Sequence, residues 1–210
     1  MNTETTFSSG NIIAKVISAV FHPLLMPVYG LLIIFSAPTL FGYLPPQVKK
    51  ILLVIVLINN VVLPLSLIPW FRYRNIISSW TIIERKERIL PMLATSFFYS
   101  ITVYIVYKFH IPPFIKSFLL TAALLAIAIT IVNFWHKISV HAAGSGAILA
   151  LVIVLSYKMH TPLTGLLIGA ILSAGLVMTS RLWLNAHKPV EVWSGFFLGI
   201  IVSGVILTLF

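Results

Sequence analysis

Long apolar runs are the feature of this sequence that most constrains its fold. A helix needs about 20 mainly apolar residues to cross the hydrocarbon core of a bilayer, which is about 30 Å thick. Runs of this kind follow one another along the chain, separated only by short charged or proline-rich segments. They lie near residues 17–39, 50–70, 90–109, 116–134, 140–157, 162–179 and 191–210. We therefore expect an all-α polytopic bundle of six to seven transmembrane helices.

The composition agrees with this interpretation. Hydrophobic residues make up 60% of the 210 residues and charged residues only 9%, with a mean hydropathy of +1.07. Soluble chains are about 45–50% apolar and about 25% charged, so a soluble domain is excluded. We expect one integral membrane domain over residues 1–210, of which residues 1–11 form a polar tail.

Missing residue types exclude several chemistries. The chain has no cysteine, and its four acidic residues are all glutamates. Thiolate nucleophiles, disulfides and cysteine-ligated metal sites are therefore excluded. Aspartate-rich magnesium motifs are excluded for the same kind of reason, and we expect neither a metal nor another cofactor.

The net charge of +10 suggests an anionic partner. The basic residues are scattered between the apolar runs instead of covering one polar face, which favours the anionic surface of a lipid bilayer over nucleic acid. The sequence predicts no particular oligomeric state.

Polar residues gather on one side of the predicted bundle. With seven spans, the N-terminus and the segments 71–89, 135–139 and 180–190 share a side. These segments are far apart in sequence, and each carries side chains suited to phosphate chemistry. Such convergence at one membrane face is the natural hypothesis for a functional site.

The segment around residues 180–191 carries the most specific pattern. It reads Ser180-Arg181, then five residues, then His187, then three residues, then Glu191. Positions four apart face each other on a helix, so the Glu191 carboxylate is expected to hold one nitrogen of the His187 ring. The other ring nitrogen is then oriented for nucleophilic attack.

The other two segments supply phosphate-binding candidates. Ser139 precedes a helix rich in small residues, where free backbone N–H groups favour an anion, and His141 lies just beyond it as a candidate proton donor. Further cations precede or adjoin the helices on this side. They are Arg85, Lys86, Arg88 and Lys137.

These three patterns resemble those of the type 2 phosphatidic acid phosphatases, a superfamily that also contains the vanadium haloperoxidases. That family carries, in order, Lys-x6-Arg-Pro, Pro-Ser-Gly-His and Ser-Arg-x5-His-x3-Asp. The third pattern matches here except that Glu191 replaces Asp. The second keeps Ser139 and His141 but not the Pro and Gly. The first is represented only by its residue types, and the resemblance covers roughly residues 80–200.

The resemblance implies a role for each matched residue. His187 is the nucleophile that forms a phosphohistidine, and Glu191 orients it. His141 protonates the leaving group and then activates water. The phosphoryl oxygens are bound by the remaining candidates, with Lys137 as a compensating cation. These are Arg181, Ser139, Arg88, Arg85, Lys86 and Lys137.

The expected function is that of an integral membrane lipid phosphatase that needs no metal. Its substrate is a phosphomonoester or diphosphate lipid such as undecaprenyl diphosphate, phosphatidylglycerol phosphate, phosphatidic acid or a lipid A phosphate. The altered first and second patterns keep two alternatives open: a lipid phosphotransferase, and a non-catalytic lipid-phosphate binder or scaffold.

The charge distribution and the family resemblance predict opposite sides of the membrane for the site. Nine of the 14 Lys and Arg residues fall on the side of the site, which by itself places that side in the cytoplasm. The resemblance favours an extracytoplasmic site, and six of the nine cations lie near the motifs. We expect a bacterial inner membrane protein with an extracytoplasmic site.

Several polar or small residues inside the apolar runs have structural interpretations. Gly165-x3-Gly169 and Gly195-x3-Gly199 favour close helix packing, and Pro23, Pro27 and Pro64 favour kinks. For His22, Asn59 and Asn60 an interhelical hydrogen bond and a functional role both stay open.

Overall fold

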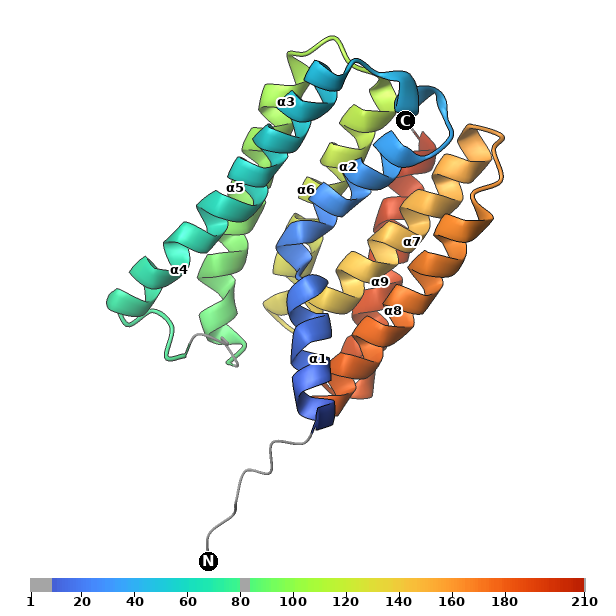
Figure 1. Cartoon of the computed structure of the whole chain (residues 1–210). Helices are drawn as coiled ribbons and strands as arrows, with labels where there is room; N and C mark the ends of the chain where they lie inside the picture. Colours follow the sequence, from blue (N-terminus) through green and yellow to red (C-terminus); the bar gives the residue numbers. More distant parts are fainter. Residues whose placement is uncertain (1–8, 80–83, 210) are drawn as a thin grey trace, which may run out of the picture.

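Every regular element in residues 9–79 and 84–209, the part that the computed structural model describes, is helical (Figure 1). The α-helices are α1 (Ser9–Val20), α2 (Met26–Ser36), α3 (Pro46–Leu57), α4 (Leu63–Tyr73), α5 (Ile89–Tyr107), α6 (Pro113–Asn133), α7 (Val140–Lys158), α8 (Thr164–Trp183) and α9 (Pro189–Leu209). Short turns join some of them: the 3₁₀ turns η1 (Pro23–Leu25), η2 (Leu40–Tyr43) and η4 (Lys86–Arg88), and the π-helical turn η3 (Ile58–Val62).

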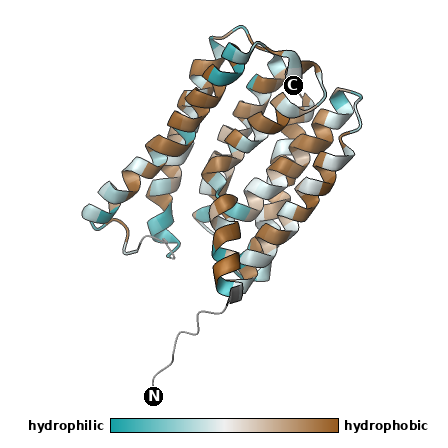
Figure 2. Cartoon of the chain, viewed as in Figure 1, coloured by the Kyte–Doolittle hydropathy of each residue, from teal (hydrophilic) through white to brown (hydrophobic). Residues whose placement is uncertain are grey.

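Seven helical segments of the described chain are long and apolar enough to cross a membrane, as the sequence predicts. Two of them are broken helices, α1 with α2 (Gly10–Ser36) and α3 with α4 (Pro46–Tyr73). Apolar residues cover the helices along their length, and polar residues concentrate near helix ends (Figure 2). The predicted tail at 1–11 is too long, because residues 9–11 already belong to α1, and its remainder lies outside the described residues.

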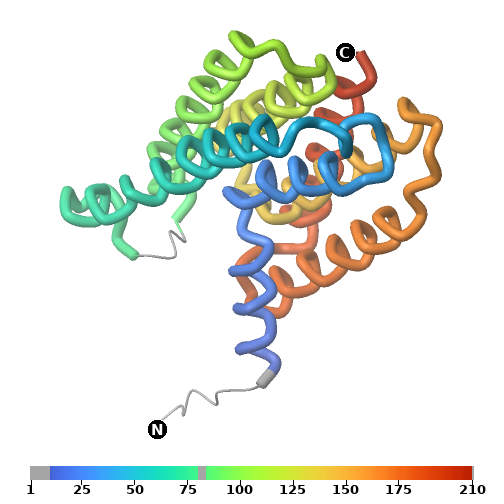
Figure 3. The backbone as a smooth tube through the Cα atoms, turned by 45° about the horizontal axis from the view of Figure 1, so that its top comes forward, coloured from blue at the N-terminus to red at the C-terminus, as the bar shows by residue number. Residues whose placement is uncertain are grey.

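The first span changes direction between Phe21 and Leu25 (Figure 3). Pro23 opens η1, and Pro27 lies in the first turn of α2, where a missing N–H costs no hydrogen bond. The break separates α1, which packs on α8, from α2, which packs on α7. It therefore brings the end of α1 to the ends of helices much later in the chain.

The second span contains the π-helical turn η3. Leu63 N–H donates to the carbonyl of Ile58, five residues back, just before Pro64. The turn carries Asn60, whose Oδ1 accepts a hydrogen bond of 2.6 Å from Thr102 Oγ1 on α5. For Asn60 the structure thus supports the interpretation as an interhelical hydrogen bond.

Helices α7 and α9 touch through their backbones. A Cβ added to Gly199 would overlap the carbonyl of Ala143, and one added to Gly195 would overlap the carbonyl of Ser139. The prediction of close packing is confirmed for this pair. It is wrong for Gly165 and Gly169, which are exposed and where a Cβ would meet nothing within 4 Å.

All the segments singled out for phosphate chemistry lie at one end of the bundle. The links between α4 and α5, α6 and α7, and α8 and α9 share that end with the start of α1, and the C-terminus lies at the other (Figure 1). We call this end the site end.

The contact between α7 and α9 yields a test with a matched control. Gly199→Ala should destabilise the protein by roughly 2 kcal/mol, because the new methyl group forces two packed backbones apart. Gly169→Ala, also within a transmembrane helix, should leave stability unchanged or raise it by up to about 1 kcal/mol through helix propensity. Thermal unfolding in detergent measures both, and equal melting temperatures for the two variants would contradict the contact.

Candidate active site

A cavity of about 550 Å³ lies within the bundle and reaches the site end. Its wall is mainly apolar and is built by residues of α2, α4, α5, α6, α7 and α9. Five basic side chains from the site end also line it. They are His22, Arg88, His141, Arg181 and His187.

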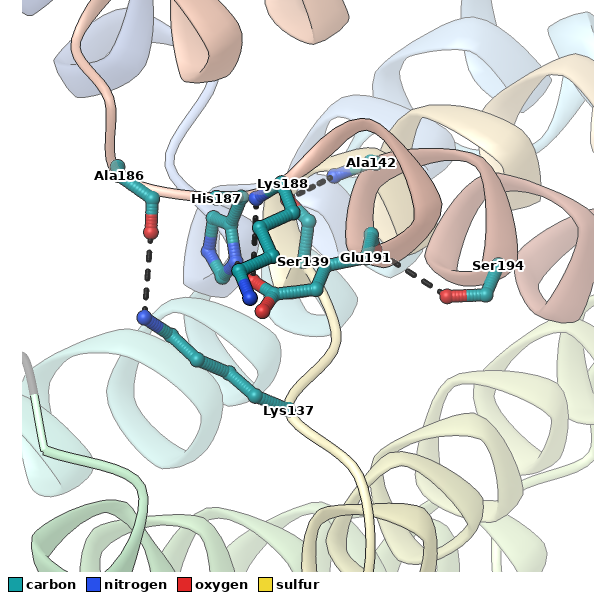
Figure 4. A network of polar contacts seen from close by, with 8 residues as sticks. All are labelled: Lys137, Ser139, Ala142, Ala186, His187, Lys188, Glu191 and Ser194. Atoms are coloured by element: carbon teal, nitrogen blue, oxygen red, sulfur yellow. Dashed lines mark hydrogen bonds and ion pairs between the residues drawn. The ribbon is translucent and has the colours of Figure 1, made fainter.

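His187 is held by a carboxylate one turn away. Its Nδ1 lies 2.7 Å from Glu191 Oε2, and the His187 side chain is only 2% exposed (Figure 4). The Lys188 backbone N–H also points to Glu191 Oε2, at 3.4 Å. The carboxylate accepts the Nδ1 hydrogen, so Nε2 is the nitrogen that carries the lone pair in the neutral ring.

The surroundings of His187 keep its imidazole neutral near pH 7. Burial lowers its pKa to about 4, against the pull of the Glu191 hydrogen bond, which raises it. The positive charges of Arg88 and Arg181 also lower this pKa. Arg88, Arg181 and His187 also line the same cavity.

His141 and Arg181 are both tied to Ser18 near the end of α1. His141 Nε2 lies 3.1 Å from the carbonyl oxygen of Ser18, and Arg181 Nη1 donates to Ser18 Oγ at 3.1 Å. A carbonyl only accepts, so neutral His141 carries its hydrogen on Nε2 and leaves Nδ1 as an acceptor. The Nε of Arg181 is buried and has no hydrogen-bond partner among the described residues.

Ser139 is fully buried and does not line the cavity. Its hydroxyl caps α7 by accepting from Ala142 N–H at 3.3 Å, and its own N–H donates to the Glu191 carbonyl at 2.9 Å. The helix start predicted to hold a phosphate is thus already satisfied by its own cap. Ser139 instead joins the first turns of α7 and α9.

Three of the predicted phosphate-binding cations lie away from the cavity. Arg85 Nη1 donates to the carbonyl of Phe134, and Lys137 Nζ donates to the carbonyl of Ala186 at 3.3 Å (Figure 4). Lys86 is exposed. The structure thus brings Arg88 and Arg181 to the cavity, together with His141 and His187, and leaves these three outside it.

Ser18 belongs to the site but was not predicted from the sequence, whereas for His22 a functional role and an interhelical hydrogen bond were both left open. Ser18 contacts both His141 and Arg181, and His22 lines the cavity with its ring centroid 5.6 Å from that of His141. Both lie before the three sequence patterns that predicted the site. Nothing in the sequence distinguishes Ser18 from other serines in apolar runs.

Comparison of the chain with protein-family models, with curated proteins and with solved structures found no match. Within residues 9–79 and 84–209, no group of three or more His, Cys, Asp or Glu side chains is arranged to hold a metal ion.

The buried pair predicts an unusual titration. His187 should remain neutral down to about pH 4, well below the ordinary value of about 6.5. Glu191→Gln should lower the pKa further, because the carboxylate favours the charged ring. Nitrogen-15 NMR of labelled histidine in detergent, assigned with a His187 variant, measures it. Glu87→Gln is the control, and a wild-type pKa near 6.5 would contradict the burial.

Proposed function

We propose that this protein is a membrane lipid phosphatase that hydrolyses a phosphomonoester or diphosphate lipid through a phosphohistidine intermediate. One observation carries the proposal: a buried His–Glu pair and two guanidinium groups meet at the polar end of an otherwise apolar cavity. A lipid phosphate combines a phosphate, which needs cations, with a tail, which needs apolar walls.

The length of the cavity suits a lipid tail. Its lining on α6 extends from Thr130 to Phe118, which are 12 positions apart in sequence. At a rise of about 1.5 Å per residue, the cavity follows α6 for about 18 Å, or more than half of a hydrocarbon core of about 30 Å. The tail can therefore stay at bilayer depth while the phosphate reaches His187.

The first chemical step is attack on phosphorus by His187 Nε2. Glu191 holds Nδ1–H, so the ring is fixed and the positive charge that develops on it is stabilised. Arg181 and Arg88 offset the negative charge on the phosphoryl oxygens. The P–O bond to the lipid breaks, and His141, in its protonated form, gives a proton to the leaving oxygen from the nitrogen that Ser18 leaves unoccupied.

The second step releases phosphate. Neutral His141 takes a proton from a water molecule, whose oxygen attacks the phosphorus of phosphohistidine. The P–N bond breaks, and its electron pair returns to His187 Nε2. Ser139 takes part only by holding α7 against α9, and thus His141 near His187.

A second candidate function is that of a non-catalytic lipid-phosphate binder. The observation that favours it is the engagement of Ser139, Arg85 and Lys137 with the protein's own backbone, which leaves fewer groups for a transition state. Transfer of the phosphoryl group to a lipid or sugar acceptor is the remaining alternative. It differs only in the acceptor of the second step.

The hydrolase proposal is tested by phosphate release. Purified protein in detergent should release inorganic phosphate from at least one lipid of a panel containing undecaprenyl diphosphate, phosphatidylglycerol phosphate, phosphatidic acid and a lipid A phosphate, with EDTA present. His187→Ala should reduce release to background, because the nucleophile is lost. His136→Ala, an exposed histidine at the same end, is the control. Full activity of His187→Ala would exclude the assigned nucleophile.

Separate measurements of lipid affinity and of phosphate release distinguish a non-catalytic binder from an enzyme. A binder should keep its affinity for phosphatidic acid in His187→Ala, lose about tenfold in Arg181→Ala, and release no phosphate from any lipid in the panel. A transferase should give phosphorylated acceptor with little free phosphate. Alkaline quenching of the enzyme with radiolabelled lipid should retain label on His187, because phosphohistidine survives base.

We further propose that the site end faces the extracytoplasmic side of a bacterial inner membrane. The chain has no cysteine, so single cysteines introduced at exposed positions report their side without background. A membrane-impermeant maleimide should label His136→Cys at the site end in intact spheroplasts, and should label His110→Cys at the opposite end only after lysis. The reverse pattern would place the site in the cytoplasm.

A further inference from the structure

His22 occupies a distinct place in the site. It stands at the joint between α1 and α2, and it lines the same cavity as Arg88, Arg181 and His187. Its ring meets that of His141 edge to face, with centroids 5.6 Å apart and planes at 80°. In the proposed reaction His187 and His141 act on the phosphate, and His22 has no role.

The hydrogen bonding of His22 fixes which ring nitrogen is free. Nδ1 accepts from the backbone N–H of Leu24 at 3.3 Å, which caps η1. An accepting Nδ1 carries no hydrogen, so the neutral ring carries it on Nε2. Nε2 has no hydrogen-bond partner among the described residues. His22 therefore offers a donor in a cavity whose wall is mainly apolar.

The neighbouring histidine offers the complementary group. His141 is bound through Nε2 to Ser18 and keeps Nδ1 as an acceptor, whereas His22 is bound through Nδ1 and keeps Nε2–H as a donor. A donor set of His22 and two guanidinium groups matches the oxygens of a phosphate monoester. The acceptor on neutral His141 matches a proton of the attacking water molecule.

We propose that His22 is a further substrate-binding residue whose Nε2–H donates a hydrogen bond to a phosphoryl oxygen. The proposal rests on the proposed function for the identity of the ligand, a lipid phosphate. It assigns to the joint of the first span a direct contact with the phosphate. A purely structural His22 would need only Nδ1, the nitrogen that caps η1.

A pair of substitutions separates the two nitrogens. His22→Asn places an acceptor near the position of Nδ1, which preserves the cap on Leu24, and it removes the donor at the position of Nε2. His22→Gln places an amide donor near the position of Nε2 and gives up the cap. Both are made in the His187→Ala background, so that no lipid is consumed during the measurement.

Binding is measured by isothermal titration in detergent with two ligands, inorganic phosphate and dioctanoyl phosphatidic acid, and melting temperatures are recorded alongside. We expect His22→Asn to weaken both ligands about tenfold with an unchanged melting temperature, since a hydrogen bond to a charged group is lost. We expect His22→Gln to retain most of the affinity while its melting temperature falls. Weakening of the lipid alone would overturn the contact with phosphate, because the free ion would then bind without it.

The opposite pattern, in which His22→Asn binds as the parent does and His22→Gln does not, would show that His22 is only a cap. Should either variant fail to fold, nitrogen-15 NMR of the His187→Ala protein decides: saturating phosphate should shift the Nε2 resonance of His22, and no shift overturns the proposal. The outcome is independent of turnover. If the protein hydrolyses no lipid but needs His22 to bind phosphate, the role of His22 stands and the hydrolase function is excluded.

Discussion

The backbone contact between α7 and α9 is the constraint on which the site depends. Gly195 and Gly199 let α9 approach the carbonyls of Ser139 and Ala143, and the N–H of Ser139 donates to the carbonyl of Glu191. No side chain separates the two helix starts at this point. Because His141 lies in the first turn of one helix and Glu191 in the first turn of the other, a shift of either helix would move the two histidines apart.

Burial sets the protonation state of His187. Removal from water and the positive charges of Arg88 and Arg181 lower the pKa of its ring, and the Glu191 hydrogen bond acts in the opposite direction. The Nε2 atom is thus unprotonated near pH 7. The same low-polarity surroundings strengthen the attraction of Arg88 and Arg181 for an anion.

The sequence predicted the features that depend on local spacing. Seven spans followed from the length of the apolar runs, and the His187–Glu191 pair followed from a separation of one helical turn. Features that depend on distant partners were not predictable, and one example is Lys137, which donates to the carbonyl of Ala186, 49 residues away. The Ser139 cap is local, but the sequence does not show that the hydroxyl accepts from Ala142 N–H instead of facing a ligand. His22 approaches His141 only because the chain bends at Pro23.

The contact between Ser18 and Arg181 also sets an order of assembly. The two residues are 163 positions apart, so Ser18 is made before Arg181. At a synthesis rate of about 5–20 residues per second, this interval is about 8–33 seconds. During that interval the carbonyl and hydroxyl of Ser18 have neither His141 nor Arg181 to bind. The site therefore forms only after α8 has been made, and its completion requires docking of α1 against α8.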